Sequence, residues 1–289
     1  MEKVKAILFD KDGTLMDFHS IWIKVAEELV AECISLYHLP STMRQTLLEE
    51  IGVEGAFVNP RSAIAAGTSL DVAECISLYH LPSTMRQTLL EEIGVEGAFV
   101  NPRSAIAAGT SLDVAKGLCN YIESAREEEM HQWVSEKLFS LMYEHRSHMK
   151  MTADLPKVLQ ALKDKGFILG VVTADDFAPT ELFLKQYKLE NFFDYIIASD
   201  TFPAQKPDKK IIEVFCEKFN LASCEVAVVG DTPTDLHLAQ NGDCYAIGVL
   251  SGTGDRPTLE PLADLVLDSV EEFISQSGEF FWEKEKSNV

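Results

Sequence analysis

The sequence predicts an α/β protein with a doubly wound parallel-sheet core and a helical domain inserted near its start. Short apolar runs rich in β-branched residues alternate with segments of helical periodicity, which favours a parallel sheet covered by helices on both faces. We expect strands at residues 7–9, 168–173, 195–198, 226–229, 245–249 and 265–267. We expect the helices of this core at residues 154–165, 178–189, 207–219 and 234–240.

Two carboxylates stand directly after the first predicted strand. Asp10 and Asp12 follow an apolar run and precede Gly13. In open α/β sheets, ligands bind outside the carboxyl ends of the strands, so both side chains are expected in a ligand crevice. An Asp-x-Asp pair alone is common, so its meaning depends on the rest of the chain.

Three further groups give this pair a context. Thr173 ends the second predicted strand, Lys206 precedes Pro207 at the expected start of a helix, and Asp231 and Asp235 follow the strand at residues 226–229. Taken singly, a Lys-Pro before a helix is usually a solvated turn and a Gly-Asp after a strand is usually a turn. Taken together, in this order and on these elements, they indicate a site.

These four groups resemble the motifs of the haloacid dehalogenase superfamily, specifically its phosphoglycolate phosphatase-like members with a helical cap. The first motif, Asp-x-Asp-Gly-Thr, spans residues 10–14, and the second is Thr173. The third is Lys206, and the fourth is Asp231 with Asp235. The resemblance implies a Rossmann-like core and the hydrolysis of a small phosphorylated metabolite.

The resemblance also implies a catalytic role for each motif. Asp10 is the expected nucleophile, forming an aspartyl-phosphate, and Asp12 is the expected general acid and base. Thr173 and Lys206 are expected to bind the oxygens of the transferred phosphoryl group. The second acid, Asp12, favours phosphoester hydrolysis over dehalogenation.

A divalent cation is the implied cofactor, because a carboxylate approaching a phosphate is otherwise repelled. Mg²⁺ prefers oxygen ligands. The expected ligands are Asp10, the backbone carbonyl of Asp12, and Asp231, with Asp235 binding directly or through water.

An exact internal repeat is the second informative feature of the chain. Residues 30–73 recur without change at residues 72–115, which gives repeat units 30–71 and 72–113. Two copies without divergence do not make a solenoid and indicate a recent, engineered or artefactual duplication. Both copies lie between Asp12 and Thr173, so the repeat enlarges the cap and leaves the core motifs intact.

The cap is predicted to be all-helical and to span residues 18–149, with the core formed by residues 1–17 and 150–289. Helices are expected from Trp22 to about Leu39, from Ser41 or Thr42 to Gly52, after Ser69, and over residues 130–149. The duplication is expected to add a helical hairpin and to allow domain swapping in a monomer or homodimer. Arg61 and Arg103 are expected mainly on solvated loops, and Asp175 as a cap of the following helix.

Composition narrows the functional classes. The net charge of −21 leaves no basic stripe and argues against nucleic-acid binding. The amino terminus enters the first strand within about five residues and no apolar run is long enough to span a bilayer, so we expect a cytoplasmic protein without membrane association. The six cysteines are expected as free thiols.

Three functions remain open from the sequence. The favoured one is a Mg²⁺-dependent phosphatase. A phosphotransferase of the phosphoglucomutase type shares the aspartyl-phosphate chemistry and would require a bisphosphate. A catalytically impaired binding or assembly protein would result if the duplicated segment prevents the cap from closing.

Overall fold

The computed structural model describes residues 3–58, 95–122, 124–275 and 280, with side chains described except at 54–58 and 95–99. The predicted helix after Ser69, the loop at Arg61 and the added helical hairpin lie outside these residues.

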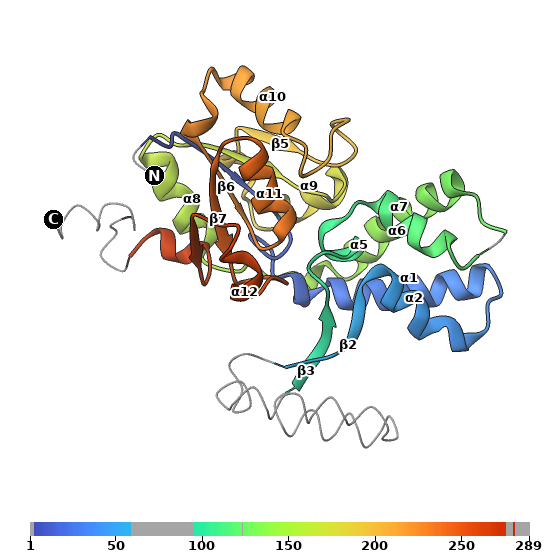
Figure 1. The fold of residues 1–289 in the computed structure, drawn as a ribbon. Coiled ribbons are helices and arrows are strands. Elements are labelled where there is room, and N and C mark those ends of the chain that lie inside the picture. The colour runs from blue at the N-terminus through green and yellow to red at the C-terminus, as the bar shows by residue number, and fades with distance from the viewer. Residues whose placement is uncertain (1–2, 59–94, 123, 276–279, 281–289) are drawn as a thin grey trace.

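The core is a parallel sheet of six strands in the order β5-β4-β1-β6-β7-β8 (Figure 1). This arrangement confirms the predicted doubly wound fold, because β1 lies in the middle and the chain builds outward on both sides. The strands are β1 (Ala6–Phe9), β4 (Ile168–Val172), β5 (Tyr195–Ile197), β6 (Val226–Gly230), β7 (Tyr245–Val249) and β8 (Leu265–Leu267).

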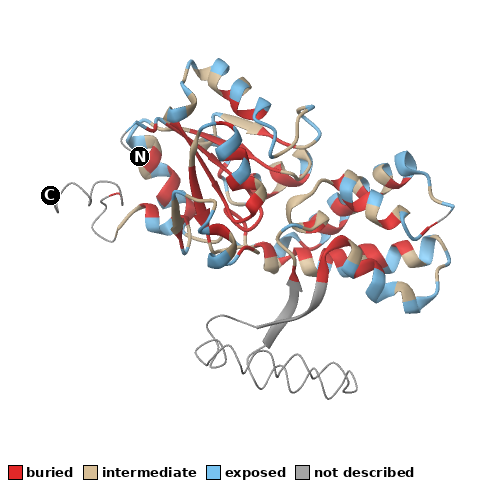
Figure 2. Ribbon diagram, viewed as in Figure 1, coloured by how far each residue is buried: buried red, intermediate tan, exposed pale blue. Residues whose placement is uncertain are grey.

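Successive side chains of β1 enter two different apolar cores, as expected for a strand covered on both faces. Ile7 and Phe9 belong to the cluster that contains the buried residues of helices α8 (Leu155–Asp164) and α9 (Phe177–Gln186). Ala6 and Leu8 belong to the cluster that contains those of α10 (Lys210–Phe219) and α11 (Pro233–Asn241). Figure 2 shows the buried sheet between exposed helix faces.

The predicted core helices are present, and the largest boundary shifts, three residues each, are at the end of α9 and the start of α10. Helix α8 begins after Asp154, whose carboxylate accepts a hydrogen bond from the Lys157 N–H, and it ends before Gly166 at φ +84°. Helix α10 was expected to start at Pro207 but begins at Lys210. A short helix, α12 (Arg256–Leu259), and short 3-10 segments complete the described core: Glu190–Phe192, Ser223–Glu225 and Val270–Phe273.

The described part of the cap is built mainly from helices, and α1 and α6 each pack against α2 and α7. These helices are α1 (Trp22–Leu36), α2 (Arg44–Ile51), α5 (Ala105–Ala108), α6 (Ser111–Cys119) and α7 (Glu127–Glu144), with 3-10 segments at Phe18–Ser20, Ser41–Met43 and Arg146–His148. In the described copy, the residue that caps α6 is Thr110, one position before the expected serine.

The described cap combines the two repeat copies. Helix α2 comes from the first copy, whereas α5 and the first half of α6 come from the second. The sequences that flank the two copies differ. Only the first copy follows the buried residues Trp22, Val25 and Leu29 of α1, and only the second precedes Leu118 of α6.

The expectation of an all-helical cap was wrong in one respect. Strands β2 (Val53–Val58) and β3 (Val95–Val100) form a two-stranded antiparallel sheet. Both strands have the same sequence, VEGAFV, one from each repeat copy, and its valines and phenylalanine favour extended backbone. The helix predicted to end near Gly52 and the loop predicted around Asn59 left the pairing of the two identical segments unforeseen.

Candidate active site

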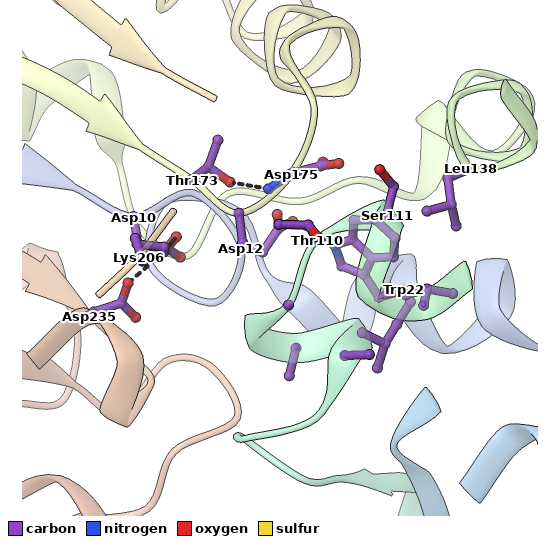
Figure 3. A pocket seen from close by; sticks show the side chains of 16 residues that line it. Asp10, Asp12, Trp22, Thr110, Ser111, Leu138, Thr173, Asp175, Lys206 and Asp235 are labelled. Atoms are coloured by element: carbon purple, nitrogen blue, oxygen red, sulfur yellow. Dashed lines mark hydrogen bonds and ion pairs between the residues drawn. The ribbon is translucent and has the colours of Figure 1, made fainter. Parts of the chain in front are cut away.

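The motif residues meet at the carboxyl edge of the sheet, as their positions after strands require. Asp10 directly follows β1, Thr173 follows β4, and Asp231 follows β6. Because β1 pairs in register with both β4 and β6, these three strand ends lie side by side. Figure 3 shows Asp10, Asp12, Thr173, Lys206 and Asp235 around one pocket.

Lys206 joins the third motif to the first and the fourth. Its Nζ lies 2.6 Å from Asp10 Oδ1 and 2.6 Å from Asp235 Oδ1. The lysine side chain is 5% exposed, which excludes the solvated turn that its Lys-Pro context alone would suggest. Burial opposes the charge on this lysine, but the carboxylates of Asp10 and Asp235 outweigh burial and raise its pKa.

Three carboxylates form a compact group that fits a divalent cation. Single oxygen atoms of Asp10, Asp231 and Asp235 all lie within 4.8 Å of one another, and all three residues are buried. Burial, with Asp235 as the next cause, raises the pKa of Asp231 to about 7. Burial also raises the pKa of Asp10, although Lys206 opposes that rise. An oxygen-rich, buried group with excess negative charge is the donor set that Mg²⁺ prefers.

Asp231 is fixed by a loop that the sequence analysis did not identify. The N–H of Thr253 donates to Asp231 Oδ2 at 2.8 Å, and the Thr253 hydroxyl lies 3.2 Å from the same atom. Glycines make this approach possible. A Cβ on Gly13, at φ +86°, would lie 2.4 Å from Asp231 Oδ2, and one on Gly252 would lie 2.0 Å from it. The run Ser-Gly-Thr-Gly after β7 was the available sequence signal.

Lys11, inside the first motif, is a second buried lysine that sequence reasoning missed. Its Nζ lies 2.7 Å from Asp12 Oδ2 and 2.8 Å from Asp175 Oδ2, and its side chain is fully buried. Burial lowers the pKa of Lys11 and the two carboxylates raise it, with a net rise. Asp175 was expected to cap the next helix. It instead pairs with Lys11. Its pKa is raised to about 6 by burial, which Lys11 opposes.

A residue of the helical cap forms a hydrogen bond with Asp12. The indole Nε1 of Trp22, the first residue of α1, donates to Asp12 Oδ1 at 2.5 Å. The Lys11 Nζ donates to the same oxygen at 2.9 Å. Sequence periodicity placed Trp22 only on the buried face of its helix, because periodicity does not report what the polar end of an indole contacts.

Thr173 is buried at the end of β4, as predicted. Its hydroxyl accepts a hydrogen bond from the Asp175 N–H at 3.1 Å. The hydroxyl proton therefore remains to be donated toward the pocket, which Thr173 lines together with Ala174.

The pocket encloses about 450 Å³ of space, part of it open to solvent, between the core and the cap. Its core side is formed by the motif residues, and its cap side begins at Trp22. Arg103 is exposed, as expected for a loop residue, and is not part of the pocket lining that the described residues form. None of the helices in the described ranges combines the length and apolar character needed to cross a bilayer.

Comparison with known proteins identifies relatives for this arrangement. A sequence profile of haloacid dehalogenase-like hydrolases matches residues 106–249. Phosphoglycolate phosphatase of Vibrio cholerae is 34% identical over 142 residues, which cover 47% of this chain and 60% of the relative. The same-named protein of Photobacterium profundum is 29% identical over 140 residues, which cover 47% and 61%. The chain thus matches about three fifths of the length of these relatives.

Solved structures share the fold over nearly the whole chain. A predicted phosphoglycolate phosphatase from Haemophilus somnus superposes with a TM-score of 0.61 at 17% identity, covering 94% of this chain and 97% of the other. CbbY from Rhodobacter sphaeroides, in complex with phosphate, gives 0.54 at 16% identity, covering 95% and 98%. The matched profile begins after the first motif, and the structure joins that motif to the remainder through β1. The chain belongs to the haloacid dehalogenase-like hydrolase family.

Proposed function

We propose that this protein is a Mg²⁺-dependent phosphatase that hydrolyses a small phosphorylated metabolite through an aspartyl-phosphate on Asp10. The observation that carries the proposal is the position of Asp10. Its carboxylate lies at the wall of the pocket, in contact with Lys206 and within the group that Asp231 and Asp235 complete. The names of the curated relatives support the same reaction class.

The residues divide the chemistry between them. Asp10 would attack phosphorus while the ester oxygen leaves with a proton from Asp12. Water would then attack the aspartyl-phosphate and give its proton to Asp12, which restores both carboxyl groups. Lys206 and the Thr173 hydroxyl are placed to stabilise charge on the phosphoryl oxygens.

The cation would be held by Asp10, Asp231 and the backbone carbonyl of Asp12, with Asp235 in support. When bound, it neutralises charge between the nucleophile and the phosphate. The chain supplies few cations of its own here. Lys206 and Lys11 are the described lysines in contact with the site carboxylates, and Lys11 is already paired with Asp12 and Asp175.

We further propose that residues 1–17 and 150–289 form the catalytic core and residues 18–149 the cap. The cap contributes Trp22, Ile106 and Leu138 to the pocket, so it covers the site in this arrangement. That position supports turnover in a closed state and gives no support to an impaired binding protein.

Phosphate release from an aryl phosphate tests the proposal. We expect release that requires Mg²⁺ and that disappears in Asp10→Asn, a substitution that keeps size and removes the nucleophilic charge. Asp208→Asn, at an exposed aspartate outside the pocket, is the matched control and should keep full activity. Activity that survives in Asp10→Asn would refute the mechanism.

A deletion variant shows whether the duplicated segment affects the activity of the motif residues. The variant lacking residues 72–113 keeps every motif residue. If it alone releases phosphate, the repeat disables turnover in the full chain. If a sugar bisphosphate is required for product formation, the phosphotransferase replaces the phosphatase.

A further inference from the structure

The two sides of the pocket differ in charge, and the difference bears on the substrate. The core side holds the carboxylates and Lys206. The cap side is formed by these residues: Trp22, Ala105, Ile106, Ala107, Gly109, Thr110, Ser111, Val114 and Leu138. Among the lining residues that the structure describes, Lys206 alone is cationic, and it lies against Asp10 and Asp235 on the core side.

The apolar part of the cap side is formed by buried side chains. Ile106, Val114 and Leu138 come from three helices, α5, α6 and α7, and are 7%, 1% and 5% exposed. The indole of Trp22 lies beside them in the lining, and its N–H already donates a hydrogen bond to Asp12. A charged substrate group that reached these side chains would lose water and gain no counterion, which is costly.

The two hydroxyls on the cap side already face carboxylates. The Thr110 hydroxyl donates to Asp113 Oδ2 at 2.8 Å, and the Ser111 hydroxyl lies 3.4 Å from Asp176 Oδ1. The Thr110 oxygen also accepts from the Asp113 N–H at 3.3 Å, and Ser111 Oγ lies 3.1 Å from His131 Nε2. Each hydroxyl oxygen has two lone pairs, so one on each remains for a hydrogen-bond donor on the substrate. Asp113 also accepts from the Thr110 N–H and thereby compensates the amino terminus of α6.

From this lining we propose that the cap side selects phosphate monoesters whose organic part is uncharged and donates a hydrogen bond, and that it disfavours a second anionic group. Phosphoglycolate, named in the relatives, carries such a group in its carboxylate. The inference rests on the proposed phosphatase function and narrows its substrate class to short hydroxylated alkyl phosphates.

A matched pair of substrates tests this inference on the full chain. 2-Phosphoglycolate and 2-hydroxyethyl phosphate have nearly the same size and differ in a carboxylate against a hydroxymethyl group. Both substrates are assayed at pH 8 with Mg²⁺. We expect kcat/KM for 2-hydroxyethyl phosphate to exceed that for 2-phosphoglycolate by at least about tenfold, the ratio equivalent to 1.4 kcal/mol.

A second experiment introduces a positive charge on the cap side of the pocket. Ala107→Lys adds a cation at a half-buried lining residue of α5 and should reduce the ratio at least about tenfold, mainly through KM for phosphoglycolate. Ala108→Lys, at the next and equally half-buried residue, which is not part of the lining, should leave the ratio unchanged.

The outcomes separate the inference from the function on which it rests. Equal or better hydrolysis of 2-phosphoglycolate by the unmodified chain overturns the inference while the phosphatase stands. An equal change of the ratio in both lysine variants also overturns it, since the effect would then not come from the lining. Hydrolysis of no monoester at all, the aryl phosphate included, refutes the proposed function instead.

Discussion

Replacing Lys11 with methionine removes the positive charge that Asp12 and Asp175 share while keeping much of the side chain's volume. Both carboxylates would then remain enclosed, with side chains 11% and 9% exposed, and without their cation. Breaking a buried ion pair by removing one partner costs about 3–5 kcal/mol. That is a large part of the 5–15 kcal/mol by which proteins are typically stable.

The assay is chemical denaturation without Mg²⁺, comparing Lys11→Met with Lys5→Met. Lys5 also pairs with a carboxylate, Glu225, but its side chain is 64% exposed, so its loss should cost less than about 1 kcal/mol. The double variant Lys11→Met/Asp175→Asn should recover part of the lost stability, because one of the two stranded charges is gone.

The direction of the pH dependence gives a further check. Without Lys11, the pKa of Asp175 should rise beyond about 6, because that lysine lowers it. The folded variant would then hold a proton that the unfolded chain has released, so its unfolding free energy should fall as pH rises from 6 to 8. A Lys11→Met protein as stable as the unmodified chain at both pH values would refute the ion-pair argument.

Three other perturbations follow from the same contacts. Burial raises the pKa of Asp231 to about 7, and metal binding requires the ionised form of this carboxyl. The rise in Tm that Mg²⁺ causes should therefore be larger at pH 8 than at pH 6. An equal rise in Tm at both pH values would contradict this. Gly13→Ala should abolish that rise, since a Cβ would lie 2.4 Å from Asp231 Oδ2, whereas Gly166→Ala, with open space around its Cβ, should keep it despite some backbone strain. Trp22→Phe should lower kcat by about tenfold or more with little change in KM, because Asp12 loses a donor; an unchanged kcat in steady-state assays would exclude that role.

The sheet was predictable from the sequence because its strands are short apolar runs at regular spacing. The same regularity predicted that Asp10, Thr173 and Asp231 would lie together, since parallel strands end at one edge. The start of α10 was misplaced because a Lys-Pro is typical of a helix start, whereas here Lys206 and Pro207 belong to the loop that carries the lysine into the site.

The contacts that were missed connect residues without a local pattern. Lys11 occupies the position of the Asp-x-Asp motif for which the motif specifies no residue, and its partner Asp175 lies 164 positions away. The Thr253 loop likewise approaches Asp231 only in the folded chain. Periodicity reports which face of an element is buried, but it does not report which polar groups meet once the elements pack.

The paired strands β2 and β3 change how the cap is closed during folding. The N–H of Asn101 donates to the Gly52 carbonyl at 3.1 Å, a contact between positions 49 apart. In a chain with a single repeat copy, the equivalent asparagine is Asn59, only 7 positions from Gly52, and the intervening VEGAFV would form one closed loop instead of two strands.

The entropic cost of closing that contact in the unfolded chain grows with the logarithm of the number of residues between its ends. Closing a loop of 49 residues instead of 7 costs roughly 1.7 kcal/mol more, which favours the shorter chain. The ladder between β2 and β3 offsets part of this cost. The duplication therefore converts a local contact into a long-range one, and the longer chain should fold more slowly through its cap even where the final packing is the same.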